Sequence, residues 1–151
     1  MSPYDLHCHS KVSDGTLSPR ELVQRAHAQG VKVLALTDHD DMRGLDEAHA
    51  TAVECGIELV AGVEVSVTWG GNTVHIVGLR LDPGHDEIVA GLRRNRAGRT
   101  ERAQKMAEAL AKLGIPGALE GAYAFADNKE LIGRSHFARF LVDKGHVRNI
   151  K

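Results

Sequence analysis

Short apolar runs alternate with amphipathic stretches over the first third of the chain. The pattern predicts two strands and two helices, at residues 4–9, 18–29, 31–37 and 44–55. The first helix has clear boundary residues, because Ser18 can cap it, Pro19 suits its first turn and Gly30 follows as a stop. This β-α-β-α order is typical of a parallel sheet or barrel built from crossover units.

The pattern changes after residue 56. It predicts two further strands and two further helices, at residues 57–68, 73–81, 86–113 and 135–144. The strands flank Gly70 and Gly71, which are typical of a hairpin turn. Ser135 is the predicted N-cap of the last helix, and residues 115–132 show no clear period.

The composition is that of a globular protein. The 151 residues are 42% hydrophobic and 26% charged, which suits a chain with its own core. The N-terminus does not resemble a signal segment, and no stretch approaches the roughly 20 apolar residues of a membrane span. We therefore expect a cytoplasmic protein with no membrane partner, and no pattern indicates the oligomeric state. Cys8 and Cys55 are too few for a disulfide framework.

The charges are unevenly distributed along the chain. Residues 1–81 carry 6 Lys and Arg against 11 Asp and Glu, whereas residues 82–151 carry 13 against 9. Six of the nine histidines lie in the acidic part. The asymmetry suggests a cation site beside an anion site, although scattered solvated charge gives similar sums.

Two histidines lie at the end of the first predicted strand. Residues two apart on a strand project to the same face, so His7 and His9 could bind one metal ion or two adjacent ones, or simply line a barrel mouth. Cys8 points to the opposite face and is expected to be a buried apolar side chain. Asp14 follows in a turn, where it is either a ligand or an ordinary turn aspartate.

A second candidate follows the strand predicted over residues 31–37. Barrels place their active sites at the carboxyl ends of parallel strands, and His39 lies there as the favoured ligand. The three neighbouring acids could be ligands, partners of His39 or helix caps. These are Asp38, Asp40 and Asp41.

The hairpin relates Glu64 to His75. If Gly70 and Gly71 are the two central turn residues, Ser66 faces His75, and Glu64 is a diagonal neighbour of His75 on the same face, roughly 7 Å away. A three-residue turn would break this relation. A carboxylate among apolar residues is costly to bury unless it is paired or bound to a cation, which favours Glu64 as a ligand.

Two arginines interrupt the apolar face of the helix predicted over residues 86–113. Arg96 and Arg99 either run along the domain edge or reach an anionic ligand such as phosphate. The helix carries four other basic residues, which we expect to form a solvated face. They are Arg93, Arg94, Arg102 and Lys105.

The start of the last helix is a candidate anion site. Free backbone N–H groups, the Arg134 fork and the Ser135 hydroxyl would together bind an anion, an interpretation compatible with plain N-capping by Ser135. His136 either contacts phosphate or simply begins the helix.

The candidate ligands comprise four imidazoles and two carboxylates: His7, His9, Asp14, His39, Glu64 and His75. This mixed donor set suits Mn, Fe or Zn better than Mg, and its size suggests more than one ion. Clustered divalent ions support the hydrolysis of phosphate esters.

With these motifs the chain resembles the PHP (polymerase and histidinol phosphatase) family of metal-dependent phosphoesterases. The matching motifs are His7-Cys8-His9-Ser10 with Ser13-Asp14-Gly15, then Thr37-Asp38-His39-Asp40, Gly62-Val63-Glu64 and His75. The resemblance implies an α/β fold, a distorted (β/α)7 TIM-like barrel, with two or three divalent ions held by the six candidate ligands. Manganese is the expected metal, with iron or zinc as alternatives.

The basic helix and residues 133–138 resemble more narrowly the nucleoside 3′,5′-bisphosphate phosphatases and related 5′-to-3′ exoribonucleases. This implies that Arg134, Ser135 and His136 contact phosphate, and we expect Arg96 and Arg99 to contact substrate as well. The implied reaction removes the 3′-phosphate of a bisphosphate such as pAp, giving AMP and phosphate, by attack of a metal-bound hydroxide. The alternatives are a 5′-to-3′ exonuclease acting on short oligonucleotides and an inactive metal-binding fragment.

The resemblance also implies a larger whole. Family members of this type have a further half that completes the metal shell, and about four strands cannot close a barrel. We therefore expect the N-terminal half of a barrel plus a helical insertion, completed by a longer chain or a second polypeptide. The expected segments are a metal-binding part, a substrate-binding cap, and a phosphate-binding turn and helix, at residues 1–81, 82–132 and 133–151.

Overall fold

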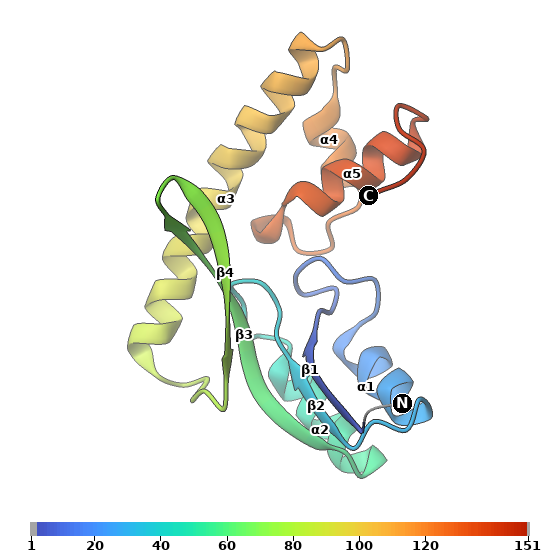
Figure 1. The fold of residues 1–151 in the computed structure, drawn as a ribbon, viewed down its shortest axis with the longest axis vertical. Helices are drawn as coiled ribbons and strands as arrows, with labels where there is room; N and C mark the ends of the chain where they lie inside the picture. The colour runs from blue at the N-terminus through green and yellow to red at the C-terminus, as the bar shows by residue number, and fades with distance from the viewer. Residues whose placement is uncertain (1–2, 151) are drawn as a thin grey trace.

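The computed structural model describes residues 3–150, and its core is one curled sheet of four strands in the order β1-β2-β3-β4 (Figure 1). The first three strands are parallel, whereas β3 and β4 form an antiparallel hairpin. The strands are β1 (Tyr4–Cys8), β2 (Val33–Leu36), β3 (Glu58–Trp69) and β4 (Asn72–Leu79). The predicted α/β fold with a partial barrel is confirmed.

Two helices, α1 (Pro19–Ala28) and α2 (Leu45–Cys55), pack together against the parallel part of the sheet. Buried side chains from both helices and from β2, including Val23, Ala48 and Leu34, form one apolar cluster. The crossover helices thus bury one face of the sheet, as the β-α-β-α pattern predicts.

A second apolar cluster lies among the helices that follow the hairpin. These are α3 (Asp86–Lys112), α4 (Ala118–Tyr123), the 3-10 turn η1 (Lys129–Leu131) and α5 (Arg134–Asp143). In Figure 1, α3 runs alongside the hairpin and α5 lies beside α4. A Cβ on Gly121 would lie 2.1 Å from a ring carbon of Phe140, so a glycine is needed where α4 meets α5.

The hairpin has the predicted register. Gly70 and Gly71 both have positive φ, which a tight two-residue hairpin turn requires. Ser66 consequently pairs with His75, so Glu64 and His75 are diagonal neighbours.

The predicted N-cap of the last helix is wrong by two residues. Gly133 is the N-cap of α5, and its backbone N–H donates to Nδ1 of His136 at 3.1 Å. Because the His136 ring reaches back to bond this N–H, the cap needs no serine, and Ser135 lies within the first turn of the helix.

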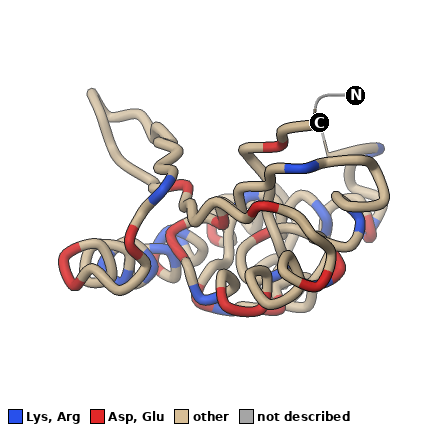
Figure 2. The backbone as a smooth tube through the Cα atoms, turned by 90° about the horizontal axis from the view of Figure 1, so that it is seen from below, with Lys and Arg blue, Asp and Glu red and all other residues tan. Residues whose placement is uncertain are grey.

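Positive and negative residues are interleaved along the backbone (Figure 2). Charge totals alone therefore do not locate a binding site in this fold. Among residues 3–150, no helix is both long enough and apolar enough to cross a membrane.

Candidate metal centre

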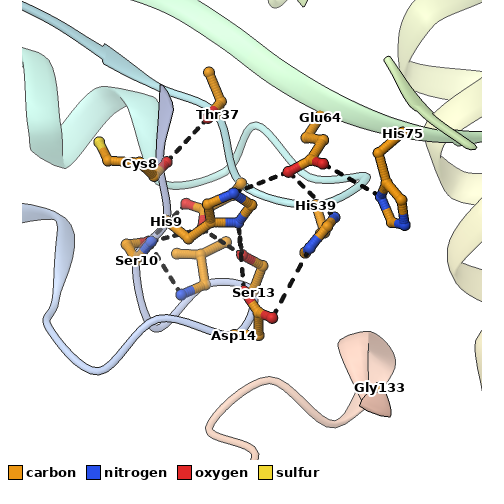
Figure 3. A network of polar contacts seen from close by, with 12 residues as sticks. Cys8, His9, Ser10, Ser13, Asp14, Thr37, His39, Glu64, His75 and Gly133 are labelled. Atoms are coloured by element: carbon orange, nitrogen blue, oxygen red, sulfur yellow. Dashed lines mark hydrogen bonds and ion pairs between the residues drawn. The ribbon is translucent and has the colours of Figure 1, made fainter. Parts of the chain in front are cut away.

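Glu64 is only 7% exposed, and its carboxylate lies among imidazole rings, of which Figure 3 shows His9, His39 and His75. Its Oε2 is 2.9 Å from Nε2 of His7 and 2.9 Å from Nε2 of His9. The Nδ1 of His39 lies 3.7 Å from the same oxygen, and the Nδ1 of His75 lies 3.4 Å from Oε1. One carboxylate thus joins side chains from β1, β3, β4 and the end of β2.

Asp14 extends this cluster on the side away from His75. Its Oδ1 is 3.3 Å from Nδ1 of His9, and its Oδ2 is 3.8 Å from Nε2 of His39. The potential ligand atoms fall into three overlapping groups, each within 4.8 Å. They are His7, His9 and Glu64; His9, Asp14 and His39; and His39, Glu64 and His75.

Two imidazole nitrogens of the cluster lack a hydrogen-bond partner. Within residues 3–150, the Nδ1 atoms of His39 and His75 are buried and make no hydrogen bond. A buried polar atom without a hydrogen-bond partner is costly, so these two nitrogens are suited to binding a ligand. The set of imidazole and carboxylate donors fits divalent metal ions, which would accept these lone pairs.

The ionisation states also suit metal binding. Burial lowers the pKa of His39 to about 4, with Asp14 opposing and His9 adding to the shift, so its ring is neutral near pH 7. Burial alone would raise the pKa of Asp14, but the hydrogen bond with His9 and the charge of His39 bring that pKa well below its usual range. Burial would likewise raise the pKa of Glu64, but His7, His39 and His9 outweigh it and the pKa is lowered.

The loop that follows β1 is held in place by a buried aspartate. Asp38, 1% exposed, accepts hydrogen bonds from the Ser10 N–H at 2.7 Å and from the Ser10 and Ser13 hydroxyls at 2.6 and 2.5 Å. A Cβ on Gly15 would lie 2.2 Å from the backbone oxygen of His9, so only glycine permits this turn. Asp38 therefore positions the loop that carries Asp14.

Asp40 is bonded to α3. It is fully buried at positive φ, and its carboxylate accepts hydrogen bonds from the Ser66 N–H, the Asn95 amide and the Arg99 guanidinium, the last at 2.6 Å from Nη2. Arg96 donates to the backbone oxygen of Asp40 at 2.7 Å. Both arginines that interrupt the apolar face of α3 thus contact an aspartate of this chain, a pairing that the sequence pattern did not indicate. A phosphate contact for either one stays a prediction.

The three acids around His39 therefore all bond to protein groups. Asp41 pairs with the Arg43 guanidinium, in addition to the contacts of Asp38 and Asp40. None of the three belongs to the potential ligand groups among the described residues.

Cys8 faces away from the cluster, as predicted. Its thiol donates to the Ala35 backbone oxygen at 3.2 Å. Burial, aided by the charges of Asp5 and Asp38, raises its pKa to about 12, so the thiol stays protonated and is a poor nucleophile.

A cavity of about 580 Å³ opens beside the cluster. Asp14, His39 and His75 line it on one side, and residues 131–135 line it on another. Ser135 lines the same cavity as Asp14 and contributes to lowering the pKa of Asp14, which places the start of α5 beside the ligand cluster.

The two other residues predicted at this anion site differ in position. Arg134 lines the cavity together with Ser135. His136 is 1% exposed, is not among the residues lining this cavity, and bonds Gly133, so the structure places it in the core as a helix-start residue.

Several supporting residues were not indicated by the sequence pattern. Arg139 of α5 donates to the Asp14 backbone oxygen at 2.5 Å, and Asn128 donates to the Val12 backbone oxygen at 2.9 Å. Both tie the helical layer to the loop that carries Asp14. No local sequence signal indicates hydrogen bonds over more than one hundred positions.

The PHP domain family matches residues 5–138, and the chain belongs to this family. The chain is 53% identical over 146 residues to a 5′-3′ exoribonuclease of Haemophilus influenzae, covering 97% of this chain and 53% of the relative. It is 51% identical over 151 residues to a 3′,5′-nucleoside bisphosphate phosphatase of Chromobacterium violaceum, covering 100% of this chain and 53% of the relative. The chain thus spans about half the length of these curated relatives.

Solved structures support the same assignment. An amidohydrolase from Chromobacterium violaceum with bound sulfate has a TM-score of 0.94 and 52% identity, over 97% of this chain and 51% of that one. A protein from Bifidobacterium adolescentis assigned as a metal-dependent phosphoesterase has a TM-score of 0.88 and 34% identity, over 97% and 51%. The resemblance to the PHP family is confirmed.

Proposed function

We propose that this chain forms the metal-binding part of a phosphoesterase that removes the 3′-phosphate of a nucleoside 3′,5′-bisphosphate. The observation that carries the proposal is the ligand cluster around Glu64, opening into a cavity whose other side holds Arg134 and Ser135. The name of the Chromobacterium violaceum relative, which is 51% identical, supports this substrate.

The six clustered side chains would hold two or three divalent ions, with manganese expected and iron or zinc as alternatives. Divalent ions in such a set activate water and neutralise charge on a phosphoryl oxygen. The ligands are His7, His9, Asp14, His39, Glu64 and His75.

The second phosphate would bind at the start of α5. Arg134 offers a planar fork that matches phosphate, and the first backbone N–H groups of a helix favour an anion. Ser135 lies in the first turn of α5 and lines the cavity together with Asp14, so it would orient the substrate relative to the metal ligands. The helical segment at residues 82–132 would act as the cap over the bound nucleotide.

Phosphate release tests the proposal. The chain with Mn²⁺ should release phosphate from adenosine 3′,5′-bisphosphate, and Glu64→Gln should abolish release, whereas Glu58→Gln, an exposed position on the same strand, should not. Calorimetric titration with Mn²⁺ gives a separate readout. Metal binding without phosphate release would favour the inactive metal-binding fragment, whereas Mn²⁺ binding that persists unchanged in Glu64→Gln would contradict the metal centre itself.

A second candidate is 5′-to-3′ hydrolysis of short RNA. Its support is the exoribonuclease name of the Haemophilus influenzae relative and of an Escherichia coli relative, 44% identical over 149 residues. Nucleotide release from a 5′-phosphorylated oligonucleotide, compared with phosphate release from the bisphosphate, separates the two.

A further inference from the structure

One face of α3 forms a wall of the cavity beside the metal ligands. Arg99, Arg102, Lys105 and Met106 all line it. Because Arg99 is held by the buried carboxylate of Asp40, this face of the helix is fixed toward the cavity. Arg102 and Lys105, expected from the sequence on a solvated face, therefore bring their charges to the cavity wall.

The Arg102 guanidinium is available to a ligand. Within residues 3–150 it makes no hydrogen bond or ion pair. It lies against Gly98, where a Cβ would be 3.2 Å from its Nη1. The missing side chain at Gly98 thus leaves room for the guanidinium beside the helix.

The Lys105 ammonium can exchange its present partner. It is bonded to Glu101 at 2.7 Å, but both side chains are 70% exposed. An exposed pair one helical turn apart contributes only about 0.3–0.5 kcal/mol, so a phosphate can replace the carboxylate.

The charges lining the cavity are unbalanced toward the positive. Four cationic side chains line it, and Asp14 is its one carboxylate among the described residues. Asp14 belongs to the metal ligands, and Arg99 is neutralised by Asp40. Arg134 on one side and the pair Arg102 and Lys105 on α3 therefore remain for anions.

A mononucleotide with two phosphates does not use all of these groups. If one phosphate lies at the metal ligands and the other at Arg134, no phosphate remains for α3. Half-buried apolar side chains in the same lining, Val67 and Met106, provide a surface for a nucleobase.

Resting on the proposed function, we propose that Arg102 and Lys105 form a further phosphate subsite that receives an internucleotide phosphate of a short single-stranded oligonucleotide. The pair sets the preference for oligonucleotides over nucleoside bisphosphates. The subsite raises the affinity for longer ligands and leaves the metal-ligating side chains unchanged.

Equilibrium binding at several salt concentrations tests this subsite. The probes are 5′-phosphorylated triadenylate and adenosine 3′,5′-bisphosphate, and the test variant is Arg102→Gln with Lys105→Gln. The control is Arg93→Gln with Arg94→Gln, which removes the same charge from exposed positions of α3 outside the cavity lining.

The test variant should bind the trinucleotide about fivefold to tenfold more weakly at low salt, with a salt slope reduced by about 0.7 for each phosphate that is no longer neutralised. Its affinity for the bisphosphate should stay within about twofold of wild type, and the control should keep both affinities. Equal reductions for both ligands, an equal reduction in the control, or a wild-type chain that does not bind the trinucleotide would each overturn the subsite.

These outcomes are separate from those of the proposed function. A chain that binds the trinucleotide through Arg102 and Lys105 yet releases no phosphate or nucleotide with Mn²⁺ would retain the subsite and contradict the proposed activity. Phosphate release by the wild-type chain, together with unchanged trinucleotide binding in the test variant, would support the proposed activity and contradict the subsite.

Discussion

Nη2 of Arg99 lies 2.6 Å from Oδ2 of Asp40, and both side chains are almost fully removed from solvent, at 11% and 0% exposure. The pair joins α3 to the residue that follows His39. The backbone of Asp40 is in turn hydrogen-bonded to the backbone of Glu64: the Asp40 N–H donates to the Glu64 backbone oxygen at 2.9 Å. The helical layer is thus fixed to the backbone beside two of the candidate metal ligands.

Removing one partner of this pair should destabilise the protein strongly. Arg99→Gln leaves the Asp40 carboxylate buried without its cation, a change that costs about 3–5 kcal/mol. Asp40→Asn with Arg99→Gln should cost less than the sum of the two single changes, because the double variant leaves no charge behind. Urea unfolding of the single and double variants measures this coupling, and strictly additive costs would contradict it.

Metal binding should stabilise the fold through Glu64. A ligand that binds only the folded state adds about 2.7 kcal/mol at one hundred times its dissociation constant, so saturating Mn²⁺ should raise Tm. Glu64→Gln removes the negative charge among four imidazoles and should abolish most of the rise. Glu58→Gln, exposed on the same strand, should keep it. The measurement is thermal unfolding with and without Mn²⁺. An equal rise in Tm in both variants would contradict the proposed metal site.

The sequence predicted those parts of the site that local geometry determines. His7 and His9 share a face because of the two-residue period of a strand, and the two-residue turn fixed Glu64 against His75. The pairing of Arg99 with Asp40 joins residues 59 positions apart, and it depends on where α3 folds back onto the sheet. No short-range sequence pattern relates residues so far apart. The sequence therefore indicated the helix face that carries Arg99, but not that Asp40 is its partner.

The start of α5 could not be predicted from residue preferences alone. Ser135 matched the usual N-cap preference, but the His136 ring bonds the Gly133 N–H and the helix begins earlier. Capping preferences favour a residue type, whereas the actual cap depends on which side chain reaches the free N–H groups.

The packing of α4 on α5 should depend on Gly121. Gly121→Ala would place a Cβ 2.1 Å from the Phe140 ring, and such overpacking typically costs about 1–3 kcal/mol. Gly91→Ala is the matched helical control, because its nearest atom is the Arg94 side chain at 3.8 Å. The control should gain up to about 1 kcal/mol from helix propensity. Urea unfolding of both variants checks the prediction, which fails if Gly121→Ala is as stable as wild type.

His136 should make the stability of the fold depend on pH. Burial lowers its pKa below the ordinary value of 6.5, with Arg139 adding to the shift and the charge of Asp14 opposing it. Its Nδ1 accepts the Gly133 N–H, which requires an unprotonated nitrogen. Because the folded pKa is the lower one, the contribution of His136 is complete above about pH 6.5 and is lost as pH falls through the folded value.

His136→Asn isolates this contribution, because an amide oxygen can accept the same N–H without titrating in this range. Other groups that titrate, including the histidines of the metal cluster, are shared by both proteins and cancel in the comparison. Between pH 7.5 and pH 5, wild type should therefore lose more free energy of unfolding than His136→Asn, even if the variant is the less stable of the two at pH 7.5. Urea unfolding at the two pH values gives both differences. Equal decreases would mean that protonation of His136 is not coupled to folding.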